Sequence, residues 1–248
     1  MIRYEEPDMS STASCVHCLG PIRPPGLWSS SWQCDDDGNT LPFFSATRPS
    51  AGALDRLRAS SGVPTWVPQP LPTGWCVSAI GWVGDERTGA RATAIACCGP
   101  APLGGAAEAV FIAEEPGVGL AARLAGLPAA ALQAGEGPGE AKVTAAHHPT
   151  PLWELPGATT DRVGYVGEAR GVWLATVFWP SIASLLLIEH MLLVDLADLP
   201  KGPNDYPWLV FGAPSGRLVK KDPVDLRAGR PQAAPAGAAG AAASDAGP

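Results

Sequence analysis

Three cysteines and one aspartate near the start of the chain have the types and the spacing of a metal site. Two residues separate Cys15 from Cys18, and two residues separate Cys34 from Asp37. A Cys-x-x-Cys turn directs two sulfurs to one point, and two such turns can complete a tetrahedron of ligands around Zn2+. The pattern therefore predicts a structural Zn2+ site formed by Cys15, Cys18, Cys34 and Asp37 in a zinc-ribbon-like module.

The sequence also offers other candidates for the fourth ligand. His17 lies inside the first Cys-x-x-Cys turn, and Asp35 and Asp36 directly precede Asp37. Two other interpretations of the thiols are a former ribbon that keeps them as small buried apolar groups and a redox-active Cys-x-x-Cys pair. The redox interpretation is disfavoured, because no strand-to-helix pattern surrounds the pair.

The residues around these ligands are typical of a small metal-dependent module. Gly20 and Gly38 each follow a ligand pair, where a sharp turn favours the positive φ that glycine adopts at low cost. The segment between the two pairs is too short to form an apolar core of its own. We therefore expect metal binding to supply the folding free energy of this module.

The composition of the whole chain favours short strands joined by many turns. Its 248 residues allow one sizeable domain and a small module. The chain contains 29 glycines and 27 prolines, which interrupt long helices. We expect a β-rich α+β fold, in which a mostly antiparallel sheet with one or two short helices is preceded by the zinc-ribbon-like module.

Composition also divides the chain into segments. These are a flexible N-terminus at 1–14, the zinc-ribbon-like module at 15–44, a connector and proline-rich strap at 45–72, the β-rich α+β domain at 73–218, and an Ala/Gly/Pro tail at 219–248. The prolines of the strap impose an extended course, and Trp66 is expected to pin it on the main domain. The tail has no apolar face to bury and is expected to be disordered.

Within the main domain, short apolar runs indicate strands and one longer pattern indicates a helix. The expected strands cover 75–83, 90–98, 107–114, 142–146, 152–155, 163–169 and 172–179. Leucines three and four residues apart predict a short helix over 117–127. The apolar run 185–196 suits either a buried helix or strands, and strands are favoured because short strands surround it.

Charged residues of the main domain could form a second chemical site. A carboxylate pair for acid–base work and a polar cluster at a hairpin end could come from Glu108, Glu114, Glu115, Asp85, Arg87 and Arg91. Solvated strand ends are the simpler interpretation, because surface charges at this density are normal. Residues 117–122 also fit a Gly-x-Gly-x-x-Ala turn, but the two glutamates just before it disfavour a bound phosphate.

Charge and hydropathy exclude several partners. The formal net charge is −7 and the N-terminal module is itself acidic, which disfavours nucleic acid. The first residues carry acids where a secretory signal needs positive charge and an apolar run. The longest apolar stretch, 182–196, is interrupted by Glu189, His190 and Asp195 and is too short to span a membrane. These features predict a cytoplasmic protein that binds neither nucleic acid nor membrane.

A series of short motifs resembles a known family. The motifs include Cys-x-x-Cys, Arg-Pro-Pro-Gly-Leu-Trp, Val-Pro-Thr-Trp-Val-Pro-Gln-Pro-Leu-Pro, Gly-Pro-Ala-Pro-Leu-Gly-Gly and Glu-Glu-Pro-Gly-Val-Gly-Leu, and the similarity extends from about Cys15 to Leu218. The chain resembles an actinobacterial family of unknown function with an N-terminal zinc-ribbon-like motif, some members of which carry the name phosphotransacetylase. The position of Asp37 is commonly histidine in that family. The residues here do not support phosphotransacetylase activity, because they include no basic phosphate cradle and no doubly wound pattern.

Two classes of function are consistent with these features. The favoured one is a cytoplasmic binding or regulatory protein that contains a zinc ribbon and contacts a protein or a small molecule. The alternative is an enzyme whose carboxylates lie where 104–108 and 114–115 meet the hairpin of Asp85, Arg87 and Arg91. A deep pocket with buried paired carboxylates would favour the enzyme. A shallow groove rimmed by some of the nine tryptophans would favour the binding protein.

Overall fold

The structure is a computed structural model that describes residues 12–27, 29–46, 48–128, 132–157, 161–200 and 206–218. Most of the N-terminus expected to be flexible, and all of the tail expected at 219–248, lie outside these residues. Within them, no helix combines the length and the apolar character that crossing a membrane requires.

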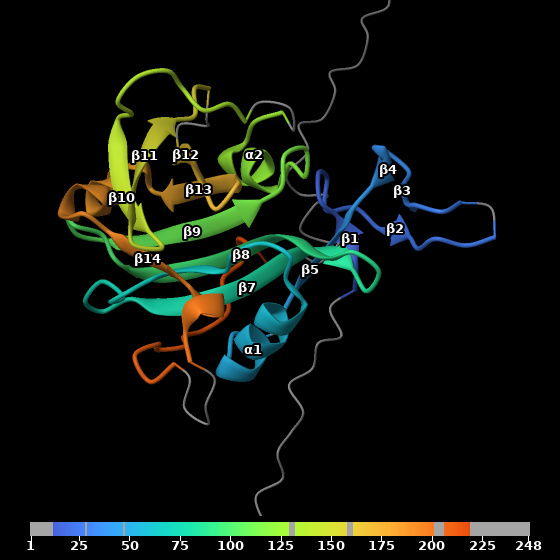
Figure 1. Ribbon diagram of the computed structural model, residues 1–248, viewed down its shortest axis with the longest axis horizontal. Coiled ribbons are helices and arrows are strands. Elements are labelled where there is room, and N and C mark those ends of the chain that lie inside the picture. Colours follow the sequence, from blue (N-terminus) through green and yellow to red (C-terminus); the bar gives the residue numbers. More distant parts are fainter. Residues whose placement is uncertain are drawn as a thin grey trace, which may run out of the picture.

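One large sheet holds most strands of the described residues (Figure 1). Its order is β1 (Ser14–Cys15), β5 (Pro42–Ser45), β7 (Cys76–Asp85), β8 (Gly89–Pro100), β9 (Ala106–Glu114), β13 (Val172–Trp179), β12 (Val163–Ala169), β11 (His148–Glu154), β10 (Ala141–Ala145), β14 (Leu192–Asp195) and β6 (Trp66–Pro68). The pairing of β10 with β14 is parallel, and the other pairings between these strands are antiparallel. The sheet curves, because β6 at its far end returns to contact β8 and β9. The expected β-rich, mostly antiparallel architecture is confirmed.

A second, small sheet and four short helices complete the described elements. The small sheet contains β2 (Ile22–Arg23), β3 (Trp32–Cys34) and β4 (Gly38–Thr40). The helices are α1 (Ala51–Ser60), α2 (Leu120–Ala125) and the 3₁₀ helices η1 (Ser181–Glu189) and η2 (Leu196–Asp198). The expected helix near 117–127 is therefore present as α2, which glycines with positive φ bound on both sides.

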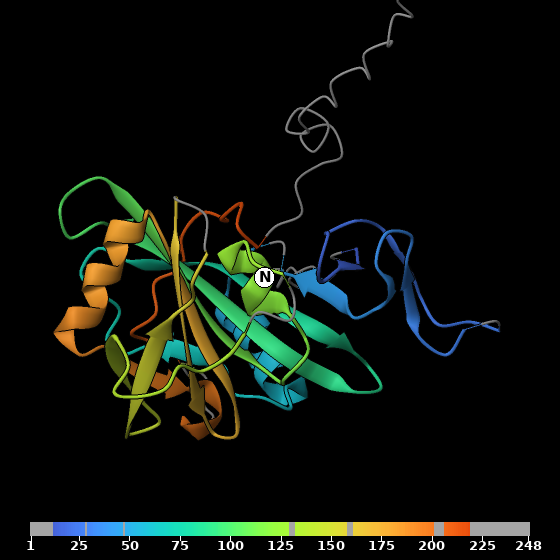
Figure 2. The ribbon, with the colours of Figure 1, turned by 90° about the horizontal axis from the view of Figure 1, so that it is seen from above.

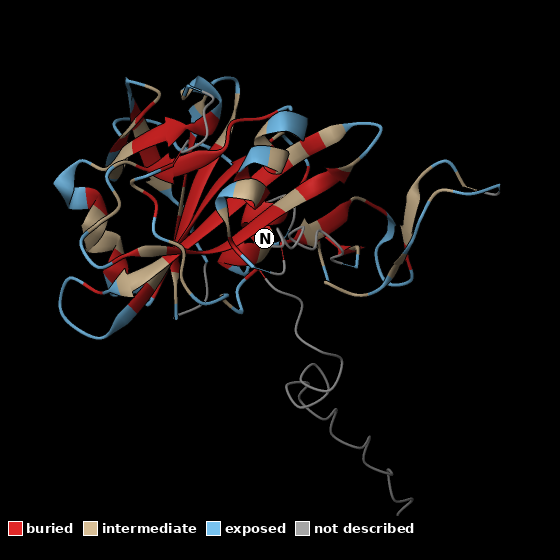
Figure 3. Cartoon of the chain, turned by 90° about the horizontal axis from the view of Figure 1, so that it is seen from below, coloured by how far each residue is buried: buried red, intermediate tan, exposed pale blue. Residues whose placement is uncertain are grey.

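The large sheet buries both of its faces. On β8, Ile95 and Cys97 point into one core while Ala94 and Ala96 point into the other, as the two-residue period of a strand requires. Helices α1 and η1 contribute to the first core, and α2 contributes to the second. Figure 3 shows the resulting pattern, in which the central strands are buried almost throughout. Burial on two faces explains why these strands are nearly continuous apolar runs.

The N-terminal module and the main sheet share backbone hydrogen bonds. Cys15 lies opposite Pro42 in the pairing of β1 with β5, and Phe43 of β5 lies opposite Val83 of β7. The hairpins β2–β4 extend from this edge, away from the rest of the molecule (Figure 2). The first predicted ligand is thus part of the large sheet, while the division between residues 44 and 45 stays a prediction.

The proline-rich strap lies extended against the main domain. Trp66 is fully buried, and β6 pairs with β14 so that Trp66 lies opposite Asp195. The Asp195 carboxylate accepts a hydrogen bond from the Thr65 backbone N–H at 3.0 Å and forms an ion pair with Arg170 at 2.8 Å. These contacts hold the strap at one edge of the sheet.

The expectation of strands over 185–196 is wrong for its first part. Residues Ser181–Glu189 form η1, and only Leu192–Asp195 form a strand. Ala183 and Leu187 are buried and Leu186 packs against the same core, whereas Ile188 is 70% exposed. One buried side of a helical turn explains this run better than the alternating burial of a strand. The consecutive leucines at 185–187 obscured the helical pattern in the sequence, because they occupy both buried and partly exposed positions of η1.

Candidate metal centre

The first Cys-x-x-Cys pair forms a tight turn at the end of β1. The Cys15 backbone N–H donates to the Gly20 carbonyl at 2.9 Å, and the Gly20 N–H donates to the Cys18 Sγ at 3.3 Å. The positive φ of this turn falls on Leu19, at 60°, and not on Gly20 as expected. A Cβ on Gly20 would lie 3.1 Å from the Cys18 Sγ, so this glycine makes room for the sulfur. The turn thus places the Cys15 Sγ in contact with Asp37 and the Cys18 Sγ in contact with Cys34.

The second ligand pair lies in the turn between β3 and β4. Cys34 is the last residue of β3 and pairs with Gly38, the first residue of β4. Gly38 has a φ of 70°, as expected for a glycine at this sharp turn. The short hairpin therefore places Asp37 beside Cys34, on the side that faces the first turn.

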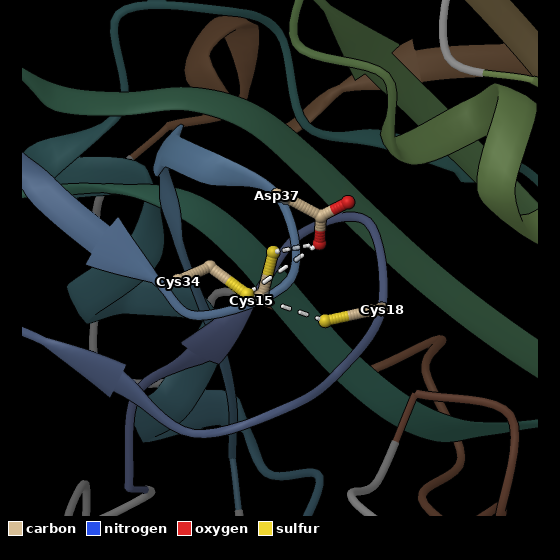
Figure 4. Close-up of side chains that lie close together, drawn as sticks. All are labelled: Cys15, Cys18, Cys34 and Asp37. Atoms are coloured by element: carbon tan, nitrogen blue, oxygen red, sulfur yellow. Dashed lines mark hydrogen bonds between the residues drawn. The ribbon is translucent and has the colours of Figure 1, made fainter.

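The two turns bring the four predicted ligands together (Figure 4). One ligand atom from each of Cys15, Cys18, Cys34 and Asp37 lies within 4.8 Å of the others. The Cys15 Sγ is 3.1 Å from the Asp37 Oδ2, and the Cys18 Sγ is 3.5 Å from the Cys34 Sγ. A single tetrahedral ion can be reached by four atoms at these separations. This cluster could hold a metal ion.

The other candidates for the fourth ligand lie elsewhere or make other contacts. The Asp35 carboxylate forms an ion pair with Arg23 at 2.8 Å. Among the described residues, the only group of cysteine, histidine and acidic side chains with metal-site geometry contains neither Asp36 nor His17. His17 contributes its backbone N–H to the Cys15 Sγ at 3.4 Å.

Burial and hydrogen bonding set the protonation of the cluster. Burial raises the pKa of the Cys15 thiol, and burial together with the hydrogen bond to Asp37 raises the pKa of Cys18. Hydrogen bonds from Cys18 and Cys15 lower the pKa of the Asp37 carboxyl. At neutral pH these shifts favour the protonated thiols of Cys15 and Cys18 beside an ionised Asp37 carboxylate. A divalent cation would take the place of the thiol protons, so its binding releases protons.

One cation faces the cluster from the main domain. The guanidinium of Arg123, on α2, lies over the ring of Phe43 at 4.7 Å from the ring centre. Burial lowers the pKa of Arg123 to about 10, and the charges of Cys15, Cys18 and Glu114 oppose that shift. Arg123 is thus a cation at neutral pH. It can offset part of the negative charge that three thiolates and one carboxylate leave on a divalent ion.

The family of the chain can be stated once this cluster is described. Residues 9–218 match a family described as a family of unknown function, DUF6758. The chain belongs to DUF6758. A search of the curated proteins and a search of the solved structures each returned no match. The match covers both the cysteine cluster and the described part of the main sheet, but it assigns neither an activity nor a metal to DUF6758.

The carboxylates of this DUF6758 chain do not gather into one site. Glu108 and Glu114 lie near opposite ends of β9, where they pair with Cys98 and Ala92 of β8. Six residues of antiparallel strand separate them by about 20 Å. The site at which residues 104–108 were expected to meet 114–115 is therefore not formed. A catalytic role for any of these residues stays a prediction.

The remaining charged candidates make local contacts. Arg91 pairs with Glu115 at 2.7 Å on the exposed end of the sheet. Asp85 accepts hydrogen bonds at 3.0 Å from the backbone N–H groups of Arg87 and Thr88, which fixes the β7–β8 turn. Its other oxygen accepts a hydrogen bond from the Trp32 indole N–H at 3.1 Å. Asp85 thus links the main sheet to the β3–β4 hairpin, which carries Cys34 and Asp37.

Glu114 has a structural role that the sequence did not reveal. Its carboxylate is fully buried and accepts a hydrogen bond from the backbone N–H of Ala121 at 3.0 Å, at the start of α2. This is where a phosphate on the Gly-x-Gly-x-x-Ala turn would bind. Burial raises the pKa of Glu114 to about 7, although hydrogen bonds from the α2 backbone oppose the shift. The chain's own carboxylate therefore caps this helix.

A pocket lies between the small sheet, β2–β4, and the main sheet. Its volume is about 640 Å³. The rings of Phe44 and Trp82 stack along it with centres 5.6 Å apart and planes 17° apart, and Trp32 lines it as well. The rest of its lining comes from Pro25, Ser60, Gly84, Asp85, Glu86, Arg87, Gly89 and Ala90. Only the position of Trp32 indicated this pocket in the sequence, since Trp32 is two residues before Cys34 on the same strand.

Proposed function

We propose that this chain is a zinc-containing binding protein in which the ion holds one wall of a ligand pocket in place. Zn2+ suits the ligand set, because three thiolates and one carboxylate in tetrahedral reach are typical of zinc and less suited to Ca2+ or Mg2+. The closed set of four ligands favours a structural ion over a catalytic one, which keeps an open position.

The position of Trp32 carries this proposal. Trp32 lies in β3, two residues before Cys34, and its indole N–H is bound to Asp85 of the main domain. Its ring lines the pocket opposite residues of the large sheet. A side chain fixed by the metal centre at one end and by the main sheet at the other couples the pocket to the ion.

The lining indicates a small ligand with a flat apolar body. The volume lies within the usual range for small-molecule sites, about 300–1,000 Å³. Stacked rings favour a planar ligand, since offset aromatic stacking contributes about 0.5–1.5 kcal/mol beyond area burial. Glu86 and Arg87 on the turn can contact a polar group at its edge. The enzyme alternative has less support, because the pocket holds no buried pair of carboxylates.

A planar probe tests the pocket. Anilinonaphthalene sulfonate is expected to bind the zinc-loaded chain, and Trp32→Ala should weaken this binding by about 2- to 12-fold, because one stacking wall is lost. Fluorescence titration measures the affinity. Trp153→Ala is the matched control, since Trp153 is a half-buried tryptophan of β11 outside the pocket. Equal affinity of wild type and Trp32→Ala would refute the proposed pocket.

The fourth ligand can be tested by replacing Asp37. Asp37→His is expected to tighten Zn2+ binding by about tenfold or more, because imidazole is a better zinc ligand than carboxylate beside thiolates. Competition with a chromophoric chelator measures the affinity. Asp36→His adds the same side chain one residue away, outside the cluster, and should leave the affinity unchanged. Weaker retention in Asp37→His than in wild type would mean that Asp37 is not a ligand.

A further inference from the structure

Two further cysteines face each other on the main sheet. Cys76 is the first residue of β7, and Cys98 of β8 lies directly opposite it. Their sulfurs are 3.6 Å apart, and both side chains are partly exposed. The neighbouring Cys97 is fully buried in the core on the other face. Two of the three cysteines of the main domain therefore form an accessible pair.

Residues next to this pair leave space for its sulfurs and place charged groups nearby. The row across the sheet continues from Cys98 to Glu108 of β9, which also contacts Arg217 at 3.3 Å. Gly212 lies over Cys76, where a Cβ would be only 2.3 Å from the sulfur. The Gly212 backbone N–H is bound to the Val77 carbonyl at 2.9 Å. A side chain at residue 212 would displace the Cys76 sulfur, so glycine there preserves the pair.

The pair is separate from the metal cluster. Val83 pairs with Phe43 of β5, the strand next to β1 and its Cys15. Val83 is seven residues along β7 from Cys76. Seven residues of strand correspond to about 24 Å. A Zn2+ ion at the cluster therefore neither uses nor protects these two thiols.

We propose that Cys76 and Cys98 form a reversible disulfide by exchange with a small disulfide. Opposed residues of antiparallel strands have Cα atoms about 4.5–5.5 Å apart, which falls within the range of about 4.4–6.8 Å that disulfides bridge. Sulfurs already in contact need only a small movement to bond. The register of β7 with β8 thus presents a modification site.

The exchange takes place in two balanced steps. One thiol loses its proton to solvent, and its thiolate attacks the small disulfide, which forms a mixed disulfide and expels one small thiolate. The second cysteine then loses its proton and attacks the protein sulfur of that mixed disulfide, which expels the second small thiolate. Two protein thiols are oxidised by two electrons, and one small disulfide is reduced to two thiols.

The thiolate requirement makes the reaction depend on pH. Burial, together with the neighbouring Cys98, raises the pKa of Cys76 to about 11. Glu108 and Arg217 are the other charged groups near this row. Below that pKa the thiolate fraction grows about tenfold per pH unit. If Cys76 attacks first, the rate should rise by about tenfold per pH unit, and so by about 100-fold between pH 7 and pH 9.

Oxidised glutathione and the zinc-loaded full chain test the proposal. We expect peptide mapping to find a Cys76–Cys98 link, with a mass lower by two hydrogen atoms, and dithiothreitol to reverse it. Cys98→Ser should stop the reaction at a glutathione adduct on Cys76, and Cys76→Ser should leave at most an adduct on Cys98. Cys97→Ala, a change at the adjacent residue on the opposite face, should still form the link.

Two outcomes would overturn the proposal. One is persistence of both thiols in the folded wild type after prolonged exposure at pH 9, while a free thiol peptide reacts. The other is a link that forms equally fast with the chain unfolded in denaturant, because the register would then confer no advantage. Zinc content measured before and after exposure separates this reaction from loss of the metal, on which the proposal does not depend.

Discussion

Replacing Cys34 with serine is expected to abolish retention of Zn2+, with an affinity loss of more than about 100-fold. Changes to the outer shell of a metal site alone cost about 10- to 100-fold, and a hydroxyl is a far weaker zinc ligand than a thiolate. Cys34 also joins the two ligand turns, since its sulfur contacts both Cys18 and Asp37. Chelator competition and elemental analysis of the purified chain would measure the loss.

Asp36→Asn is the matched control for this experiment. Asp36 lies in the same turn but is exposed and outside the cluster, so its replacement should leave zinc retention unchanged. The Cys34→Ser chain should also lose affinity for the planar probe, because Trp32 is no longer held. Zinc retention at wild-type level in Cys34→Ser would show that the cluster does not bind the ion.

The pH dependence of stability should reveal the buried Glu114 carboxyl. Burial raises its pKa from 4.5 to about 7 in the folded chain. The folded state therefore holds the proton more tightly, so its contribution to stability is complete below about pH 4.5 and is lost as pH rises through about 7. The shift corresponds to about 3 kcal/mol. Relative to Glu114→Gln, which does not titrate, the wild type should lose about this much between pH 4 and pH 8.

Urea unfolding of the two proteins at several pH values measures this difference. Loss of metal at low pH affects both chains alike and cancels in the comparison. Glu115→Gln is the control, because Glu115 is the neighbouring acid on the exposed end of the sheet and pairs with Arg91. A difference between wild type and Glu114→Gln that stays constant with pH would contradict a buried carboxyl of raised pKa.

The sequence was most informative where chemistry constrains spacing. Cys-x-x-Cys and Cys-x-x-Asp leave few ways to arrange four ligands, and the structure brings Cys15, Cys18, Cys34 and Asp37 together. The prolines around Trp66 likewise permit little but an extended strap, which is what β6 shows. Leucines in helical spacing predicted α2, since a short helix on a domain surface needs one apolar side to pack against the core.

The rest depended on tertiary arrangement, which local patterns do not encode. The separation of Glu108 from Glu114 follows from their positions on one strand, but the partners of Glu114 come from α2, across a turn. The pocket joins Trp32 of the small sheet to Phe44 and Trp82 of the large sheet, and the sequence did not specify how the two sheets are arranged. The cysteine pair required the register of β7 with β8, where a shift by one residue would point one thiol to the other face.

The two ends of the large sheet are protected by different means. At one end, β6 finishes at Pro68 and is followed by Pro70, and prolines lack the N–H that a further strand would need. At the other end, the cover over β5 is β1, a strand of two residues whose second residue is Cys15. If a metal ion holds Cys15 in place, its loss would therefore uncover β5, with Phe43 and Phe44, as a template for another copy. An ion bound there would then limit self-association at this edge, where the only proline of β5 is its first residue, Pro42.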